Sequence, residues 1–194
     1  MSDFIVRIRW LAAILLLVVI SGCTGMPDNI TPVSQFDINR YLGKWYEIAR
    51  LDHSFERGMD NVTAEYAMME DGGVSVLNSG YVTEDEKWKK ADGKAYFVGT
   101  QDEGHLKVSF FGPFYGSYVI FELDKNDYQY AFVTSYDKSY LWLLSRSPAV
   151  SDKLRKRFVK LSADLGFATD ELIYVNHDGH DKDSLPQDKT PGGK

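Results

Sequence analysis

The sequence predicts an all-β fold, an eight-stranded antiparallel up-and-down β-barrel with one C-terminal α-helix packed outside and a short extra strand. Three observations predict it. From residue 45 to residue 146 the chain is rich in Tyr, Phe, Val and Trp. Gly, Asp and Asn interrupt this stretch at regular intervals, which is typical of many short strands joined by turns. After residue 147 the apolar spacing changes from that of a strand to that of a helix.

The composition is that of one globular domain. The chain has 194 residues, of which 44% are hydrophobic and 26% are charged. These values exclude a disordered chain or a protein with many membrane spans. A formal net charge of -6 argues against a nucleic-acid partner, because phosphate contacts need a positive surface. The single cysteine, Cys23, can form no disulfide within the chain and no thiolate metal cluster.

The first 23 residues follow the order of a lipoprotein signal peptide. Arg7 and Arg9 form a basic flank, an apolar run extends from residue 10 to residue 20, and small residues precede Cys23. The run is about half the ~20 residues that a transmembrane helix needs. Residues 20–23 (ISGC) resemble the bacterial lipobox, which implies cleavage before Cys23 and a lipid on its thiol. A plain secretory signal and an uncleaved anchor are the alternatives.

These features divide the chain into four parts. We expect residues 1–22 to be the signal peptide and residues 23–35, which contain two prolines, to be a lipidated tether. Residues 36–177 form the folded domain, and the polar tail of residues 178–194 is expected to be disordered. Thr24 follows the cysteine, where lipoproteins retained in the inner membrane usually have Asp. Resemblance to bacterial lipoproteins therefore implies a lipid-anchored protein of the outer membrane that faces the periplasm.

Eight strands are expected near residues 44–51, 62–69, 73–82, 94–100, 104–110, 117–124, 128–135 and 140–146. The clearest covers residues 106–110 (LKVSF), where apolar and polar side chains alternate and so face opposite sides of a sheet. Polar connections at 70–73, 101–104 and 124–127 predict tight turns. The connections at 53–61, 83–93 and 111–116 are longer and more apolar. Since alternate connections lie at opposite ends, we expect a cup with one closed end and one end rimmed by long aromatic loops.

Residues 151–165 predict an amphipathic helix. Leu154, Phe158, Leu161 and Leu165 recur at helical spacing and form one apolar stripe. Basic residues occupy the other face, namely Lys153, Arg155, Lys156, Arg157 and Lys160. We expect the helix to pack outside the barrel with a solvated basic face, and contact with anionic lipid headgroups is the alternative. A short strand at 171–175 is expected along the edge of the first strand.

Three separated motifs together resemble the conserved blocks of the lipocalin family. They are residues 43–49 (GKWYEIA), 134–136 (TSY) and 145–148 (SRSP). Within the family, the chain is similar to the bacterial outer-membrane lipoproteins of the Blc type and to animal apolipoprotein D. The resemblance implies structural roles for Gly43, Trp45, Thr134 and Arg146, with Arg146 stacked on Trp45 at the closed end. One departure is Ser135, where many lipocalins have Asp.

The resemblance also implies which strand residues face the inside of the barrel. Glu47 and Ala49 of the first strand and Met68 of the second are expected there. The expected ligand-binding residues are Tyr66, Asn78, Phe97, Leu106, Val108, Phe110, Tyr140 and Trp142. An apolar lining with a few hydroxyl, amide and indole groups suits an acyl chain with its polar head near the mouth. The resemblance implies that fatty acids or (lyso)phospholipids are carried or stored for maintenance of the cell envelope.

The residues do not indicate an enzyme, a cofactor or a metal site. None of the four histidines lies in a motif with a nucleophile and an orienting carboxylate. For Glu47, a buried and hydrogen-bonded carboxylate is the preferred interpretation over a general base. Residues 177–181 (HDGHD) are interpreted as a flexible polar segment. The alternative function is an anchored interaction or structural protein of the envelope with a largely filled barrel, and a homodimer is left open.

Overall fold

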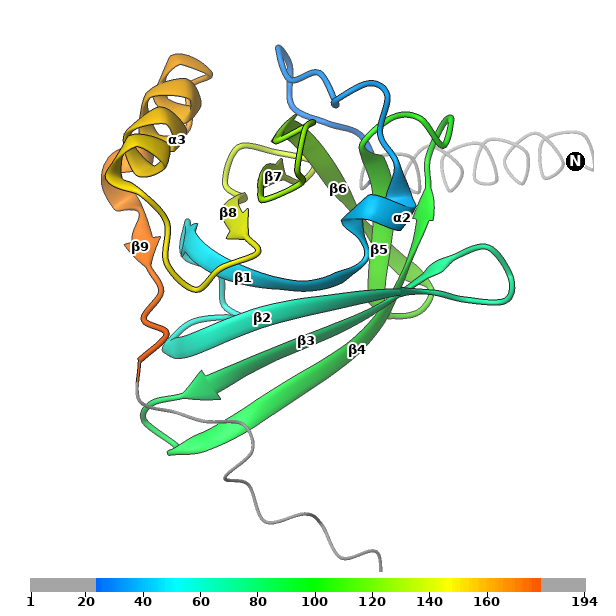
Figure 1. Ribbon diagram of the computed structural model, residues 1–194. Coiled ribbons are helices and arrows are strands. Elements are labelled where there is room, and N and C mark those ends of the chain that lie inside the picture. Colours follow the sequence, from blue (N-terminus) through cyan, green and yellow to red (C-terminus); the bar gives the residue numbers. More distant parts are fainter. Residues whose placement is uncertain (1–23, 179–194) are drawn as a thin grey trace, which may run out of the picture.

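The computed structural model describes residues 24–178, which form a closed antiparallel β-barrel (Figure 1). Its strands are β1 (Gly43–Arg50), β2 (Met59–Met68), β3 (Val74–Val82), β4 (Lys87–Phe97), β5 (His105–Phe111), β6 (Phe114–Leu123), β7 (Tyr130–Thr134) and β8 (Leu141–Ser145). Consecutive strands pair from β2 to β8, β8 pairs with β1, and β1 pairs with β2 to close the barrel. The predicted eight-stranded barrel is therefore confirmed.

Two helices and a ninth strand complete the fold. The short helix α2 (Ile38–Tyr41) precedes β1, and α3 (Asp152–Asp164) follows β8. The side chain of Ser151 accepts a hydrogen bond from the backbone N–H of Leu154 and so begins α3. A 3-10 turn, η1 (Thr169–Glu171), leads to β9 (Ile173–Tyr174), which pairs antiparallel with β1. Both the outer helix and the extra edge strand were expected.

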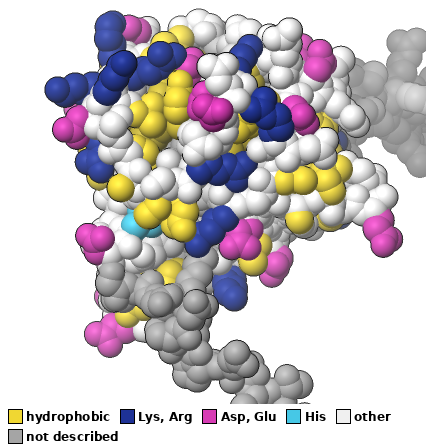
Figure 2. All heavy atoms as spheres, viewed as in Figure 1, with side chains coloured by type: hydrophobic (Ala, Val, Ile, Leu, Met, Phe, Trp, Pro, Cys, Tyr) yellow, Lys and Arg dark blue, Asp and Glu magenta, His cyan; other side chains and the backbone are white. Residues whose placement is uncertain are grey.

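The buried apolar side chains form two clusters, one inside the barrel and one between the barrel and α3. Phe158 of α3 is fully buried in the outer cluster, with its ring 4.9 Å from that of Phe132 on β7. The basic residues of α3 lie on the exposed side, and Figure 2 shows Lys and Arg side chains gathered over this helix. The amphipathic pattern thus positions α3 with its apolar stripe against the outside of the sheet.

The prediction of long loops at 83–93 and 111–116 is wrong. Strand β4 begins at Lys87, and β6 begins at Phe114, so the connections shrink to residues 83–86 and 112–113. Residues 87–93 (KWKKADG) are mostly exposed on the extended hairpin, and an exposed strand lacks the apolar alternation that identifies strands in a sequence. Trp88 packs its ring against Tyr81 of β3 at 5.7 Å, a cross-strand pair that supports the hairpin.

A β-bulge in β1 reverses the expected inside and outside positions after Glu47. Glu47 pairs with Leu144 and Ala49 with Leu143, so Ile48 is the extra residue. Ile48 and Ala49 both lie in the outer cluster beneath α3, and the expected inward position of Ala49 is wrong. Arg50 points to the inside instead. The expected inward position of Met68 is also wrong, because Met68 lies at the end of β2 with 44% of its surface exposed.

Residues 24–35, the expected tether, lie against the barrel in the structure. The backbone of Val33 bonds Ile120 and Gly104, and the side chain of Ile30 is buried. The carbonyl of Thr24 accepts a hydrogen bond from Nε2 of His105 at 3.1 Å. The segment is therefore held by the barrel up to the first described residue. The expected signal peptide, Cys23 and the tail from residue 179 lie outside the described residues. Within residues 24–178, no helix is both long and apolar enough to cross a membrane.

Candidate ligand-binding cavity

The barrel encloses a cavity of about 690 Å³. It extends from Ile38 and Tyr41 of α2 to Phe111, Phe114 and Tyr136 at the opposite end of the barrel. Phe111 and Phe114 are highly exposed, so the cavity reaches the surface at this end, which we call the mouth. The mouth lies among the connections β1–β2, β3–β4, β5–β6 and β7–β8.

The opposite end is closed by stacked aromatic and guanidinium groups. Trp45 is fully buried, with the Tyr41 ring 4.6 Å away and the guanidinium carbon of Arg146 3.9 Å from its ring centre. Arg146 also donates hydrogen bonds of 2.8 Å to the carbonyls of Lys44 and Arg40. The expected stack of Arg146 on Trp45 is therefore present. Gly43 has φ of +89° beside this stack, a conformation that L side chains rarely adopt.

The other predicted motif residues hold the β7–β8 connection. The Thr134 hydroxyl donates to the carbonyl of Tyr140 at 2.7 Å, and the Ser135 hydroxyl donates to the carbonyl of Ser117 at 2.7 Å. Asp137 accepts a hydrogen bond from the backbone N–H of Ser139. Asp137 thus supplies an Asx-type turn contact inside the connection, and the departure at position 135 leaves a hydroxyl that is itself hydrogen-bonded.

The cavity brings together seven of the eight expected ligand-binding residues, Tyr66, Asn78, Leu106, Val108, Phe110, Tyr140 and Trp142. Phe97 is not among the lining residues. It is the last residue of β4, next to the closed end, where its ring packs against Phe36 at 6.2 Å. Strand parity predicted the correct face for Phe97, but not that this position lies below the floor of the cavity.

The cavity also has lining residues that the sequence reading missed. They include Phe55, Glu56, Lys89, Lys90 and Tyr118. Lys89 and Lys90 belong to the part of β4 for which the sequence predicts a loop. Glu56 lies in the β1–β2 connection, and no pattern in the sequence indicates that this carboxyl turns inward.

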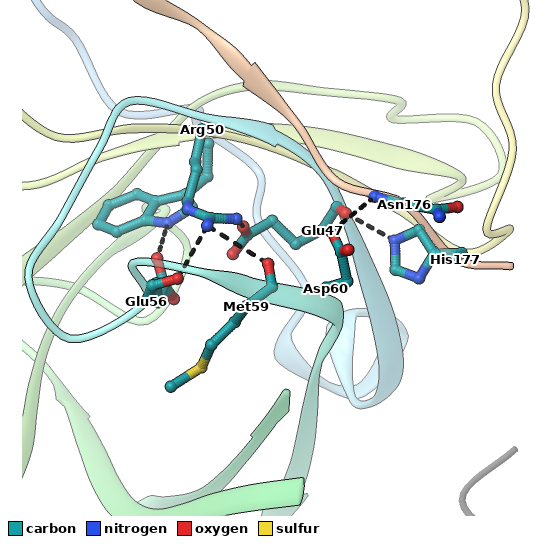
Figure 3. Close-up of polar contacts among 8 residues, drawn as sticks. Glu47, Arg50, Glu56, Met59, Asp60, Asn176 and His177 are labelled. Atoms are coloured by element: carbon teal, nitrogen blue, oxygen red, sulfur yellow. Dashed lines mark hydrogen bonds and ion pairs between the residues drawn. The ribbon is translucent and has the colours of Figure 1, made fainter. Parts of the chain in front are cut away.

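A polar cluster lies in the wall of the cavity (Figure 3). Nη1 of the buried Arg50 donates to Oε1 of Glu47 at 2.8 Å, and Nη2 donates to the carbonyl of Glu56 at 2.8 Å. The indole N–H of Trp142 donates to Oε2 of Glu56 at 3.1 Å. Arg50 therefore bonds the carboxyl of Glu47 and the backbone of Glu56, while the indole of Trp142 bonds the carboxyl of Glu56. The preferred interpretation of Glu47 as a buried, hydrogen-bonded group is confirmed.

Burial controls the protonation of this cluster. It raises the pKa of Glu47 well above its usual range, and the charge of Glu56 raises it further, against the opposing effect of Arg50. Burial also raises the pKa of Glu56, while the hydrogen bond from Trp142 lowers it. Both carboxyls are thus shifted toward the protonated form, and the positive charge of Arg50 opposes this shift in each of them.

His53 of the β1–β2 connection covers this cluster. Its ring stacks on Tyr140 at 4.7 Å and on Phe55 at 5.2 Å, and it is almost fully buried. Burial lowers the pKa of His53 to about 4, and the nearby positive charge of Arg50 contributes to the shift. At neutral pH the ring is therefore uncharged, and it packs behind the lining residues Phe55 and Tyr140.

The C-terminal segment covers the gap that opens between β1 and β2 beyond the bulge. The backbone N–H of Asn61 donates to the carbonyl of Asn176. The backbone N–H of Asn176 donates to the Asp60 side chain (Figure 3). Nε2–H of His177 donates to the carbonyl of Glu47 at 2.7 Å. His177 is thus held against the barrel. Among residues 24–178, no group of three or more potential metal ligands is found.

Comparisons with known proteins agree with this architecture. Residues 36–177 match a family model described as a lipocalin-like domain. The outer membrane lipoprotein Blc of Vibrio cholerae serotype O1 is 58% identical over 167 residues, which cover 86% of this chain and 98% of that protein. Its namesake from Escherichia coli K12 is 45% identical over 163 residues, 84% of this chain and 92% of that protein. Apolipoprotein D of Rattus norvegicus is 32% identical over 124 residues, 60% and 65% of the two chains.

Solved structures share the same fold. Insecticyanin from the tobacco hornworm Manduca sexta superposes with a TM-score of 0.62 at 22% identity, covering 78% of this chain and 86% of that one. The cockroach allergen Per a 4 gives 0.61 at 20% identity, covering 78% and 94%. The high identity to outer membrane lipoproteins over nearly their whole length confirms the predicted location of this lipoprotein at the outer membrane. The motifs, the closed barrel and these comparisons together show that the chain belongs to the lipocalin family.

Proposed function

We propose that this protein carries or stores a single-chain acyl lipid, a fatty acid or a lysophospholipid, in its barrel for maintenance of the cell envelope. The observation that carries the proposal is the cavity of about 690 Å³, which is lined mainly by apolar side chains and reaches the surface at the mouth. Ligand pockets typically have volumes of roughly 300–1,000 Å³ and a small number of placed polar groups. Family membership supports a binding function, and we assign the chain no catalytic activity.

The distribution of charge in the cavity supports entry of the acyl chain with its tail first. Lys89 and Lys90 are exposed lining residues on the extended hairpin at the mouth, where they suit a carboxylate or phosphate head. Deeper in the cavity, the two carboxyls of Glu47 and Glu56 share the single guanidinium of Arg50 as their cation, and burial raises the pKa values of both. A buried anionic head would add to this imbalance, and an unpaired buried charge is costly.

The second candidate is an anchored interaction or structural protein with a largely filled barrel. The exposed rings of Phe55, Phe111 and Phe114 at the mouth would suit a partner surface. The volume of the cavity favours the carrier, because a filled barrel leaves no room of this size.

Native mass spectrometry and Trp fluorescence titration of the detergent-extracted, delipidated mature protein test the carrier function. We expect palmitic acid and lysophosphatidylcholine to bind with one molecule per barrel. Ala64→Phe, which fills the cavity, should weaken binding at least about tenfold. Glu65→Phe is the matched control, because Glu65 is exposed on the next position of β2 and does not line the cavity. Absence of retained lipid together with an unresponsive Trp signal would refute the carrier and favour the second candidate.

Attachment is proposed to occur through lipid on Cys23, with the barrel on the periplasmic face. Two or more acyl chains give stable anchoring, since each buried methylene contributes roughly 0.8 kcal/mol. Membrane fractionation compares the wild type with Cys23→Ala, and the variant should move to the soluble fraction. A Cys23→Ala protein that still sediments with the outer membrane would contradict the anchor.

A further inference from the structure

Three tyrosine hydroxyls meet at the bottom of the cavity. Tyr41 comes from α2, Tyr66 from β2 and Tyr118 from β6, and all three side chains line the cavity. The hydroxyl of Tyr118 lies 2.8 Å from that of Tyr41 and 3.0 Å from that of Tyr66. The Tyr41 ring in turn rests on Trp45. We call these three residues the tyrosine floor.

A count of protons shows that the tyrosine floor has one hydrogen-bond donor in excess. Three neutral hydroxyls supply three protons, and two hydrogen bonds between them use two. Whichever oxygen donates in each bond, one hydroxyl proton is left without an acceptor among residues 24–178. Burial raises the pKa of Tyr66 to about 12, and it also raises the pKa values of Tyr41 and Tyr118, so the three hydroxyls keep their protons at neutral pH.

Because of this excess proton, a ligand that reaches the tyrosine floor should provide a hydrogen-bond acceptor. A buried donor that loses its acceptor costs about 1–3 kcal/mol. An alkyl terminus that displaces a water from the floor offers no acceptor, whereas an oxygen atom does. An uncharged oxygen suits this place best, because Arg146, whose charge acts on the three tyrosines, does not line the cavity, whereas the carboxyls of Glu47 and Glu56 do.

On the basis of the proposed lipid-binding function, we propose that the tyrosine floor is a hydrogen-bond site for an uncharged oxygen at the far end of the acyl chain. Its ligands are then acyl chains with a terminal hydroxyl, ether or carbonyl oxygen, with the acid head at the mouth. This extends the ligand class from plain acyl chains to chains oxygenated at the ω end.

The dimensions of the cavity allow this arrangement. On β3 the lining residues run from Val74 to Gly80, and six steps of ~3.3 Å along a strand tilted by ~40° correspond to a depth of about 15 Å. An extended palmitoyl chain is longer than this depth. Its end therefore reaches the tyrosine floor while its carboxylate stays beside Lys89 and Lys90.

Isothermal titration of the delipidated mature protein with palmitic acid and ω-hydroxypalmitic acid tests the site. We expect the wild type to bind both with affinities within about threefold of each other. The triple variant Tyr41→Phe/Tyr66→Phe/Tyr118→Phe has no donor left, so it should lose roughly tenfold for the hydroxylated acid while palmitic acid changes less than about threefold. Removing all three hydroxyls together avoids an orphaned partner, and far-UV circular dichroism checks that the variant folds.

The single variant Tyr118→Phe separates the proton count from a simple loss of contact. Without the central hydroxyl, Tyr41 and Tyr66 each keep an unshared proton, so binding of ω-hydroxypalmitic acid should be retained. ω-Methoxypalmitic acid, which only accepts hydrogen bonds, should behave like the hydroxylated acid. Tyr46→Phe is the matched control, because Tyr46 lies in the outer cluster and should leave both affinities unchanged.

The outcomes distinguish this site from the proposed function. If palmitic acid itself does not bind the wild type, the carrier function fails and the site fails with it. If palmitic acid binds, but ω-hydroxypalmitic acid binds more weakly than palmitic acid by the same factor in the wild type and in the triple variant, only the floor site is refuted. If the triple variant does not fold, the wild type alone decides. The site is overturned if the wild type binds palmitic acid but neither of the two ω-oxygenated acids.

Discussion

Replacing Arg146 with alanine should destabilise the closed end of the barrel without changing the cavity. The guanidinium lies 3.9 Å from the ring centre of Trp45 and donates hydrogen bonds to the carbonyls of Lys44, Arg40 and Tyr41. It ties β8 to the segment before β1, although it does not line the cavity itself. Arg146→Ala removes all these contacts and leaves the carbonyls to water.

The expected loss of unfolding free energy is about 3 kcal/mol. A cation–π contact at a partly desolvated site contributes about 1 kcal/mol. Hydrogen bonds from a charged donor contribute ~1.5–3 kcal/mol each when buried, and the half-exposed position of Arg146 reduces this value to about 1 kcal/mol for each of the two short bonds. For a protein of this size, 1 kcal/mol corresponds to about 2–4 °C in Tm, so we expect a decrease of about 10 °C.

Urea unfolding followed by far-UV circular dichroism measures the effect, and a palmitic acid titration of the same variant measures binding. Arg155→Ala is the matched control. Arg155 also lies over an aromatic ring, that of Tyr174 at 5.7 Å, but it is exposed on α3, and its loss should cost less than about 0.5 kcal/mol. An Arg146→Ala protein with the stability of the wild type, or with lipid affinity reduced as much as its stability, would refute this reasoning.

Three further predictions follow from buried groups. Phe158→Ala should cost about 3–5 kcal/mol in urea unfolding, because it leaves a cavity beside Phe132 beneath α3. His53 takes up its proton only near pH 4 in the folded protein, whereas the unfolded chain binds this proton at about pH 6.5. The free energy of unfolding therefore falls as the pH decreases from 6.5 to 4, by up to about 3 kcal/mol. His53→Phe should show a flatter dependence between pH 6.5 and 4, and an identical slope in both proteins would contradict the assignment. The folded protein holds the proton of Glu47 more tightly than the unfolded chain does, so the contribution of Glu47 to stability decreases as the pH rises above about 4.5. Glu47→Gln should remove that decrease in a series of urea unfolding curves from pH 5 to 8. A Gln variant that keeps the decrease would exclude Glu47 as its source.

The sequence predicted the elements that bury one face and expose the other. Residues 106–110 alternate strictly and lie in β5, and the apolar stripe from Leu154 to Leu161 lies on α3, with Leu165 as its C-cap. The first half of β4 is exposed, so its sequence carries no alternation and predicts a loop. The alternation of apolar and polar residues reports only on burial, whereas an exposed hairpin is held by backbone pairing, which every residue except proline can provide.

The candidate site was predicted where strand parity continues without interruption. Tyr66 and Asn78 lie on regular parts of β2 and β3 and line the cavity as expected. Parity failed at Ala49, because the bulge at Ile48 inserts one residue and shifts the pattern. The contact between Glu56 and Trp142 joins residues 86 positions apart, and no local pattern records such a pair.

The way β1 closes the barrel has a consequence for the speed of folding. One edge of β1 meets β8, and the other meets β2 and then β9, with Glu47 and His177 hydrogen-bonded across 130 positions. Contacts between such distant residues form slowly, because the entropy of closing the loop is lost before they stabilise the fold. Until nearly the whole chain has been delivered, the edge of β1 that faces β8 and the part that faces β9 stay unpaired and invite pairing with other chains. The last residues of the described chain therefore set the time for which the protein is exposed to aggregation.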